Sequence, residues 1–552
     1  MWQAPPCGSV WRLGRAVTTP PRPGHERPTL RTVRVIRRSR GARPDANSHR
    51  SGDVLSPSQP CDGEMTPRVT AKSLPHQSTV GTHSSPASRG AAPSDRSEPA
   101  SRGRAARAQV PRGIHGDWKP DPARPDPVSL LEAQAVSRVQ DLVPLRYGRM
   151  LVSPFTFFRG AAYLMASDLA GIPHTGLTVQ LCGDAHLSNF GTFAAPDRRL
   201  VFGLNDFDET LPGPFEWDVK RLVASFAVAG RDRGFDTTQR RSVNLSVVRS
   251  YRTAMRDLAQ RKRLDVWYAR LDMDEVEQLI GDQVKGRQGK RFEKNVAKAR
   301  AKDSMKAFNK LVREVDGRPR LVSDPPLVVP VHELFAGAEY RQLETGLRTV
   351  LKSYRRSLQG DHRHLLEGFE FVEAARKVVG VGSVGTRAWI AFLLGNGDDD
   401  PLFLQAKEAE ASVLEPFLGR SKHANHGQRV VEGQRLMQST SDVLLGWART
   451  DGVDGTQRDF YIRQLWDGKG SAVVELMKPS AMKTYARVCG WTLARAHARS
   501  GDAAAIAAYL GSGEGFDSAL ADFAESYADQ NEQDHAALKR AVESDRITAT
   551  TG

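Results

Sequence analysis

The sequence VQLCGDAHLSNFG at residues 179–191 is followed closely by RLVFGLNDFDE at residues 199–209, and each stretch joins a short apolar run to polar residues. The polar residues are Asp184, His186, Asn189, Asp206 and Asp208. The connection between the two apolar runs has the length of a hairpin, so we expect the polar groups at the ends of adjacent strands. The pattern predicts an acidic site beside a hairpin.

Carboxylates and an amide in this arrangement are the groups that phosphoryl transfer requires. One carboxylate orients or deprotonates the acceptor hydroxyl, and oxygen ligands hold Mg²⁺ against the phosphates. We expect Asp184 to act on the acceptor, and Asn189 and Asp206 to bind the metal, with Asp208 a further candidate ligand. His186 is interpreted as a hydrogen-bonding support of the loop in preference to a general base. A structural role stays open, because Asp and Asn also cap turns.

A second group of candidate residues lies about 200 residues further on, in a strand-patterned segment that begins at Ala374. There GVGSVGTR, residues 380–387, forms a glycine-rich turn, and LQAKEA contains Lys407. Glycines let backbone N–H groups approach phosphates, while a lysine pairs with phosphate oxygens and with an acid on a helix. A dinucleotide site would need a helix after the glycines, which the strand pattern argues against. The predicted nucleotide-binding residues are Gly380, Gly382, Ser383, Gly385, Lys407 and, as the helix acid, Glu432.

These residues resemble the aminoglycoside phosphotransferase branch of the protein-kinase-like superfamily, whose catalytic loop reads His-Gly-Asp-x-His-x-x-Asn. The matching residues are Gly183, Asp184, His186 and Asn189, and Cys182 stands in place of the first His. The resemblance implies ATP and Mg²⁺ as cofactors. It also implies that Asp206 binds the metal in preference to Asp208, and that Asp218 holds the catalytic loop from a helix.

The order of these parts differs from that of an ordinary kinase, in which the glycine-rich loop and the lysine precede the catalytic loop. A circular permutation accounts for the order if the cut falls between the helix at residues 485–501 and Val179. We therefore expect an α+β protein with a two-lobed, permuted kinase-like fold. Its expected parts are a disordered extension at residues 1–115, a helical lobe at 116–373, a small antiparallel β lobe at 374–475, and helices at 476–552 that complete the helical lobe.

Over roughly residues 140–500, the chain is also similar to an uncharacterised bacterial family, the domain of unknown function 2252. The similar stretches are SPFTFFRGAA, GDAHLSNFG, NDFDETLPGPFEWDVKRL, GVGSVGTR, LQAKEA, GQRVVEGQR and YIRQLWDGKGS. The family label implies no particular activity. Arg159 in the first stretch is expected to contact a phosphate or an acidic acceptor, because guanidinium groups bind oxyanions through two hydrogen bonds. An ion pair of Arg159 with Glu209 or Asp218 is the alternative.

The net charge of +15 is concentrated at the N-terminus. Residues 1–110 hold 18 basic and 7 acidic residues, a surplus of 11, so the remainder is close to neutral. Their Pro, Ser, Arg and Gly content predicts disorder, and their deletion is expected to leave the melting temperature unchanged. A basic tail for nucleic acid is the alternative. Residues 285–313 hold 11 basic and 2 acidic residues, which we interpret as the solvated face of an amphipathic helix in preference to a phosphate or nucleic-acid site.

Composition limits the remaining possibilities. No run approaches the roughly 18 apolar residues of a membrane span, and no secretory signal is evident, so a cytoplasmic protein is expected. Four widely spaced cysteines predict neither a zinc site nor a disulfide framework. The expected function is an ATP- and Mg²⁺-dependent phosphotransferase acting on a hydroxyl of a small molecule, without a membrane or nucleic-acid partner for the folded part. The alternatives are an adenylyl transferase, a nucleotide-binding pseudoenzyme, or a non-catalytic binding protein.

Overall fold

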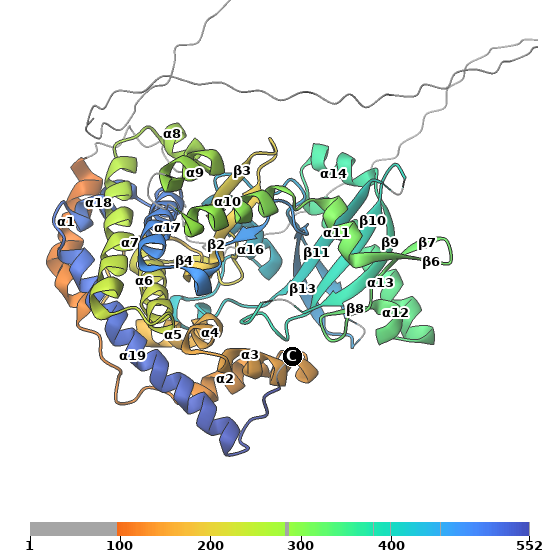
Figure 1. The fold of residues 1–552 in the computed structure, drawn as a ribbon, viewed down its shortest axis with the longest axis horizontal. Coiled ribbons are helices and arrows are strands. Elements are labelled where there is room, and N and C mark those ends of the chain that lie inside the picture. Colours follow the sequence, from red (N-terminus) through yellow and green to blue (C-terminus); the bar gives the residue numbers. More distant parts are fainter. Residues whose placement is uncertain (1–96, 282–285, 379, 398, 453, 551–552) are drawn as a thin grey trace, which may run out of the picture. The chain divides into compact units, whose positions relative to one another are not determined.

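The computed structural model describes residues 97–550 except 282–285, 379, 398 and 453. All of them belong to the second of two units into which the chain divides, Ser88–Gly552. This unit is a mixed α+β structure in which one six-stranded sheet lies beside a larger helical region (Figure 1). The predicted α+β class is confirmed for these residues. The part of the predicted extension before residue 97 lies outside them.

The six-stranded sheet is antiparallel, with the order β12-β13-β11-β10-β9-β8. Its strands are β8 (Val328–Pro330), β9 (Glu370–Lys377), β10 (Ala388–Leu394), β11 (Pro401–Ala409), β12 (Gly446–Asp451) and β13 (Gln457–Gln464). In this register, Lys407 on β11 lies opposite Ala388 on β10 and Tyr461 on β13. The expected start of the sheet at Ala374 is wrong, because β8 and the first residues of β9 precede it.

Both faces of the sheet are covered, which explains the long apolar runs of its strands. One face, with Phe392 and Phe403, packs against α11 (Ser304–Leu311) and the β6–β7 hairpin (Val312–Val315 and Arg318–Leu321). The other face, with Leu393 and Leu404, packs against α13 (Gly337–Ser357) and α14 (Gly360–Glu367). Residues 304–373 therefore belong with the sheet, whereas the sequence pattern assigned them to the helical lobe.

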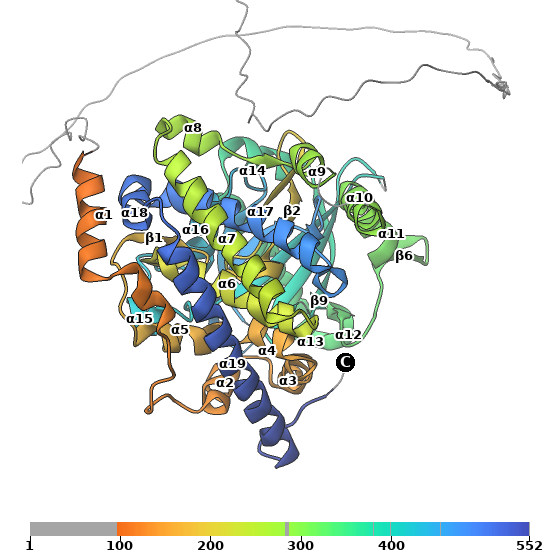
Figure 2. The ribbon, with the colours of Figure 1, turned by 60° about the vertical axis from the view of Figure 1, so that its left-hand side comes forward.

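The helical region is built around α6 (Phe215–Asp232), α7 (Thr237–Leu258), α17 (Pro479–Ser500) and α19 (Gly515–Glu543). Helices α7 and α17 lie side by side in both ribbon views (Figures 1 and 2). They approach closely at Gly490, where a Cβ would lie 2.3 Å from the Val247 carbonyl oxygen. Among the described residues, no helix combines the length and the apolarity that crossing a membrane requires.

Shorter helices complete the described chain. They are α2 (Pro127–Ala135), α3 (Val143–Leu151), α4 (Pro154–Gly160), α5 (Ala162–Ala170), α8 (Arg263–Tyr268), α9 (Met273–Gly281), α10 (Arg287–Arg300), α12 (Val331–Leu334), α15 (Glu415–Leu418), α16 (His426–Met437) and α18 (Ala503–Leu510). Helix α16 contacts β11, β12 and β13 on one side and α17 and β1 on another, so it lies between the sheet and the helical region.

A hairpin joins the two acidic stretches, but the apolar runs at residues 179–181 and 200–204 do not pair with each other, so their predicted adjacency is wrong. Strand β1 (Thr178–Leu181) pairs with β4 (Leu211–Pro214), and a four-stranded sheet has the order β14-β2-β3-β5. Its strands are β2 (Phe190–Ala194), β3 (Leu200–Leu204), β5 (Leu271–Asp272) and β14 (Gly470–Ser471). The polar residues follow β1 and β3, so the hairpin brings the two stretches to one place.

The C-terminal end of α17 meets the beginning of β1, although the two are about 320 residues apart in the chain. The Gln180 amide donates a hydrogen bond of 3.2 Å to the Ser500 hydroxyl. A Cβ on Gly501 would lie 2.9 Å from the Thr178 carbonyl oxygen. The helix at residues 485–501 therefore ends where the strand of the acidic loop begins.

Helix α1 (Ser97–Gln109) corrects the predicted extension of residues 1–115. It packs against α18, and a Cβ on Gly103 would overlap the Ala505 carbonyl oxygen at 2.0 Å. Ala106 is buried in the main core. Small residues let the two helices approach, which a search for large apolar residues does not detect. Deleting residues 1–110 would remove this packed helix, so we now expect that cut to lower the melting temperature instead of leaving it nearly unchanged.

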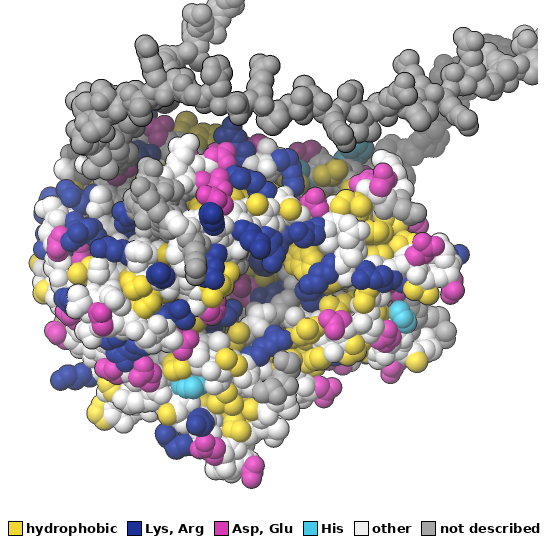
Figure 3. All heavy atoms as spheres, viewed as in Figure 1, with side chains coloured by type: hydrophobic (Ala, Val, Ile, Leu, Met, Phe, Trp, Pro, Cys, Tyr) yellow, Lys and Arg dark blue, Asp and Glu magenta, His cyan; other side chains and the backbone are white. Residues whose placement is uncertain are grey.

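The basic segment at residues 285–313 forms two helices, α10 and α11, with a break between them. Val296 and Ala299 are buried, whereas Lys290, Lys294 and Lys298 are exposed. Lys and Arg side chains gather on the molecular face over these helices (Figure 3). The predicted amphipathic character is therefore present, although in two shorter helices.

Candidate active site

The loop after β1 is held by Asp218 in the first turn of α6. The amides of Cys182 and Gly183 donate to its two carboxylate oxygens at 2.8 and 3.1 Å, and His497 contacts it at 3.2 Å. Gly183 has a φ of +82°, and a Cβ there would lie 2.3 Å from the Glu209 carbonyl oxygen. Only glycine fits this conformation and spacing, so the two acidic loops are in direct backbone contact.

Asp184 follows in this loop and is held from α6 as well. Arg221 donates from Nε to Asp184 Oδ1 at 2.9 Å and from Nη2 to the Phe158 carbonyl at 2.6 Å. Burial raises the pKa of Asp184, and the charge of Arg221 opposes that rise only in part. A carboxylate with a raised pKa is a better proton acceptor, which suits a general base or an acceptor-orienting group.

His186 and Asn189 complete the loop. The His186 Nδ1 accepts from the Ser188 amide at 3.2 Å, and its Nε2 lies 3.7 Å from Asp184 Oδ2. Burial lowers the pKa of His186, so the ring is neutral and supports the loop by hydrogen bonding. Asn189 donates from Nδ2 to the Asp184 carbonyl at 2.8 Å. Among the described residues nothing donates to its Oδ1, which leaves this oxygen for a ligand.

Asp208 in the second acidic loop is held from the sheet. Lys407 forms a close ion pair with its Oδ2, and the Tyr461 hydroxyl donates to its Oδ1 at 2.7 Å. Burial favours the neutral acid, but the charge of Lys407 outweighs it and lowers the pKa of Asp208 to about 2. Asp208 is therefore ionised, and both of its oxygens are engaged.

Asp206 has a different environment, although it lies two residues away. Its Oδ1 accepts a hydrogen bond from the Asp208 amide at 3.4 Å, and its carboxyl group is also hydrogen-bonded to that of Asp208. Burial and the charge of Asp208 raise its pKa, while Lys407, Arg463 and Lys469 oppose the rise. The charge of Arg463, together with burial, lowers the pKa of Lys469 to about 7. The carboxylate oxygens can bind a metal ion, and the cations beside them can bind phosphates. A metal ion with bound phosphates therefore fits this place better than a metal ion alone or phosphates alone.

The glycine-rich turn between β9 and β10 closes this region. Gly380 and Gly385 have φ values of +69° and +90°, which explains the glycines there. The turn is tied to the helical region, because Arg149 donates to the Gly380 carbonyl at 2.7 Å and the Val139 amide to the Gly385 carbonyl at 2.8 Å. Ser383 lies with its hydroxyl 3.5 Å from Asp208 Oδ2.

One cavity of about 70 Å³ unites most of the predicted residues. It is lined by Asp184, Asn189, Asp206, Asp208, Gly382, Ser383 and Arg159, together with Gln134, Arg138, Arg146, Gly160, Ala162, Glu209 and Thr386. Lys407 is bound to its wall through Asp208. We call this space the acidic cavity. Arg159 has no ion pair with Glu209 or Asp218 in the described structure. It lines the acidic cavity instead.

The prediction that Glu432 is the helix acid that pairs with Lys407 is wrong. It is paired with Arg435 on α16, at 3.6 Å, and about two-fifths of its side chain is exposed, while Lys407 takes Asp208 as its partner. The face of α16 that meets the acidic loop carries Arg429 instead, which donates to the carbonyls of Asp208 and Thr210 at 2.8 Å. The helix supports the backbone of the acidic loop and not the lysine.

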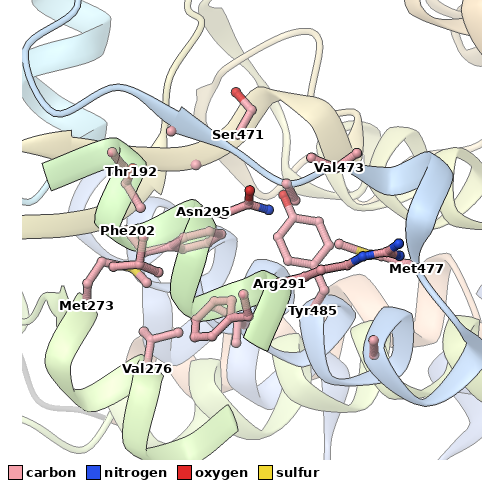
Figure 4. A pocket seen from close by; sticks show the side chains of 18 of the residues that line it. Thr192, Phe202, Met273, Val276, Arg291, Asn295, Ser471, Val473, Met477 and Tyr485 are labelled. Carbon is pink, nitrogen blue, oxygen red and sulfur yellow. The ribbon is translucent and has the colours of Figure 1, made fainter. Parts of the chain in front are cut away.

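Two larger cavities are lined by other residues. One of about 210 Å³ lies between α10, α17 and β14, lined by side chains such as Phe202, Met273 and Val276, and no acid lines it (Figure 4). The Tyr485 hydroxyl in its wall donates to the carbonyls of Leu187 and Phe190. Another of about 290 Å³ lies between α13 and the sheet face that points away from Lys407. Both cavities are larger than the acidic cavity. Among the cavities described, however, only the acidic cavity brings together the acids and the amide that the predicted chemistry requires.

A dedicated metal cage is absent from the described residues, which contain no cluster of three or more His, Cys, Asp or Glu side chains arranged for a metal ion. Mg²⁺ does not need one, since it binds through one or two carboxylates, water and substrate phosphates. The oxygens of Asp206 and Asn189 fit such a partial ligand set.

The structure thus defines an α+β protein with a cation-lined acidic cavity between a sheet and a helical region. The chain belongs to the family described as "Uncharacterized protein conserved in bacteria (DUF2252)", whose family model matches residues 138–541. That range includes both acidic loops, the glycine-rich turn and Lys407. Neither a curated protein nor a solved structure matches the chain significantly.

Proposed function

We propose that this protein is an ATP- and Mg²⁺-dependent phosphotransferase with a circularly permuted, two-lobed kinase-like fold, acting on a hydroxyl of a small molecule. The observation that carries the proposal is the acidic cavity, where the loop of Asp184 and Asn189 meets Asp206 beneath the glycine-rich turn. Lys407, on the opposing sheet, is ion-paired with the same acidic stretch.

The sheet supports the kinase comparison. In protein kinases a glycine-rich loop covers the phosphates and the phosphate-binding lysine lies on the third strand. Here the glycine-rich turn joins β9 to β10, and Lys407 lies on β11, the next strand in the sheet. The contact between the end of α17 and the start of β1 supports the permutation, because it is where a continuous chain would join them.

Each residue of the acidic cavity has a separate role in the proposed phosphoryl transfer. Asp184 orients the acceptor hydroxyl and takes its proton, while Asp206 and Asn189 would hold Mg²⁺. The bound metal would neutralise charge on the donor phosphates. Lys407 would exchange Asp208 for phosphate oxygens, with Arg463 and Lys469 beside them. Small-molecule sites measure roughly 300–1,000 Å³. The acidic cavity is smaller, so a nucleotide enters by moving the glycine-rich turn away from Asp208.

Calorimetry of ATP binding to the full chain, with and without Mg²⁺, tests this function. We expect binding that depends on Mg²⁺ and weakens about tenfold in Lys407→Met. Lys539→Met, which removes an exposed lysine on α19, is the matched control and should bind as the wild type does. Label transfer from γ- or α-labelled ATP then separates phosphoryl from adenylyl transfer. If wild-type protein binds no nucleotide under either condition, the proposal is wrong.

A further inference from the structure

Three arginines line the acidic cavity without a carboxylate partner. Arg138, Arg146 and Arg159 come from the segment between α2 and α4, ahead of the first acidic loop. Within the described chain none of them takes part in an ion pair. Two acids of the cavity wall are engaged elsewhere, since Asp184 pairs with Arg221 and Asp208 with Lys407.

Their hydrogen bonding is incomplete as well. Arg146 is fully buried, and its Nη2 donates to the Gly160 carbonyl at 3.1 Å, but its Nε and Nη1 have no partner in the described structure. The Nε atoms of Arg138 and Arg159 are also buried and unpartnered. A desolvated cation that lacks a partner is costly, and an anionic ligand in the cavity would supply the missing acceptors.

Two further acids line the cavity, of which Asp206 faces the cations of the sheet and Glu209 forms no ion pair with the arginines in the described structure. Burial raises the pKa of Glu209 to about 7, against the opposing hydrogen bond from the Val413 amide. The Glu209 carboxyl has a backbone partner instead. Its Oε2 accepts from the Val413 amide at 2.8 Å, so it is directed to the segment after β11.

We propose that these three arginines bind an oxyanion, a phosphate or a carboxylate, carried by the acceptor of the reaction. The inference rests on the proposed phosphotransferase function and specifies its substrate class. The cavity volume of about 70 Å³ equals roughly two waters at ~30 Å³ each, which is enough for one such group. The arrangement disfavours polycationic acceptors such as aminoglycosides, because three guanidinium groups repel them.

The donor phosphates have separate cations on the sheet side. Lys407, Arg463 and Lys469 act on Asp206, whereas the charge of Arg159 acts on Asp184. An acceptor anchored at the arginines has its hydroxyl beside Asp184. The hydroxyl oxygen then bonds to the γ-phosphorus, the bond from that phosphorus to ADP breaks, and the proton passes to Asp184.

The test is calorimetry of the full chain with inorganic phosphate and, separately, malonate, each with and without a saturating non-hydrolysable Mg·ATP analogue. We expect at least one anion to bind equally well in both conditions. Arg159→Gln should weaken that binding about tenfold or more and change the affinity for the analogue less than about twofold. Arg241→Gln removes a surface arginine paired with Asp522 and is the matched control, expected to bind as the wild type does.

The outcomes separate the possibilities. Binding of phosphate alone or of malonate alone supports the site and identifies which oxyanion it prefers. The proposal is overturned if neither anion binds, or if the anion competes with the analogue and Arg159→Gln weakens the analogue instead, since the arginines then serve the donor. Anion binding that depends on Arg159 in a protein that binds no nucleotide would establish the anion site and refute the phosphotransferase function. Arg146→Met is a second variant for the same anion-binding measurement. Its melting temperature is checked first, so that a loss of anion binding is not due to unfolding.

Discussion

Asp184 and Asp208 are both acids with a cationic partner, but the partners come from different regions. Arg221 belongs to α6 in the same helical region as Asp184, whereas Lys407 reaches Asp208 from the six-stranded sheet. The first pair persists if the sheet moves, and the second does not. The position and proton affinity of Asp184 are therefore set locally, while those of Asp208 depend on how closely the sheet approaches.

The largest expected effect is on turnover. Asp184→Asn removes the proposed proton acceptor, so turnover should fall by about 100-fold or more. Mg·ATP affinity should change by less than about twofold, because the metal and phosphate ligands remain. ATP hydrolysis and calorimetry measure the two quantities. Asp522→Asn on the surface is the control, and full turnover in Asp184→Asn would contradict the assigned role.

The next effect distinguishes the second acidic loop from the first. Asp206→Asn removes the charged oxygen that we propose as a Mg²⁺ ligand, so the Kd for Mg·ATP should rise about tenfold or more. Binding of ATP without Mg²⁺ should be unchanged or slightly tighter, because the substitution removes a negative charge. Equal affinity of Mg·ATP for wild type and variant, measured by calorimetry, would show that Asp206 is not a ligand.

Substitutions of Asp206 and Asp208 should have different effects on the free energy of unfolding when no ligand is bound. Asp208→Asn leaves Lys407 buried without its anionic partner, and we expect a loss on the order of 1–3 kcal/mol in the free energy of unfolding. Asp206→Asn should cause no loss, because it relieves repulsion between two neighbouring carboxylates. Urea unfolding of the two variants makes the comparison. An equal loss in both would mean that the ion pair with Lys407 contributes little.

The smallest effect concerns Glu209, which lies between the two acids. The folded protein keeps its proton to a pH of about 7, while the unfolded chain releases it near its ordinary pKa of 4.5. The folded state thus binds more protons in this window, so wild-type stability falls as pH rises through it. Glu209→Gln lacks this term, and its melting temperature relative to wild type should rise between pH 5 and pH 8. A difference that does not change with pH would contradict the raised pKa.

Local patterns predicted the parts of the site that lie close together in sequence. The acids of residues 184–208 are joined by one hairpin, so their proximity follows from chain connectivity. Arg221 was missed although the signal was present, because it lies three residues after Asp218 and therefore on the same face of α6.

The error at Glu432 has a steric cause. A Cβ on Gly433 would lie 2.5 Å from the Thr210 side chain, so α16 packs against the acidic loop through Gly433 and Arg429, four residues apart. Glu432 is turned away from this face. The helix itself was predicted correctly, but its rotation depends on a tertiary contact of a glycine, which propensity and periodicity do not reveal. The same holds for Arg138 and Arg146, which tertiary folding alone brings to the cavity.

The hydrogen bond between Gln180 and Ser500 bears on the order of elements along the chain. Two segments that lie about 320 residues apart in the chain are within hydrogen-bonding distance there, so the order of elements along the chain does not determine which of them pack together.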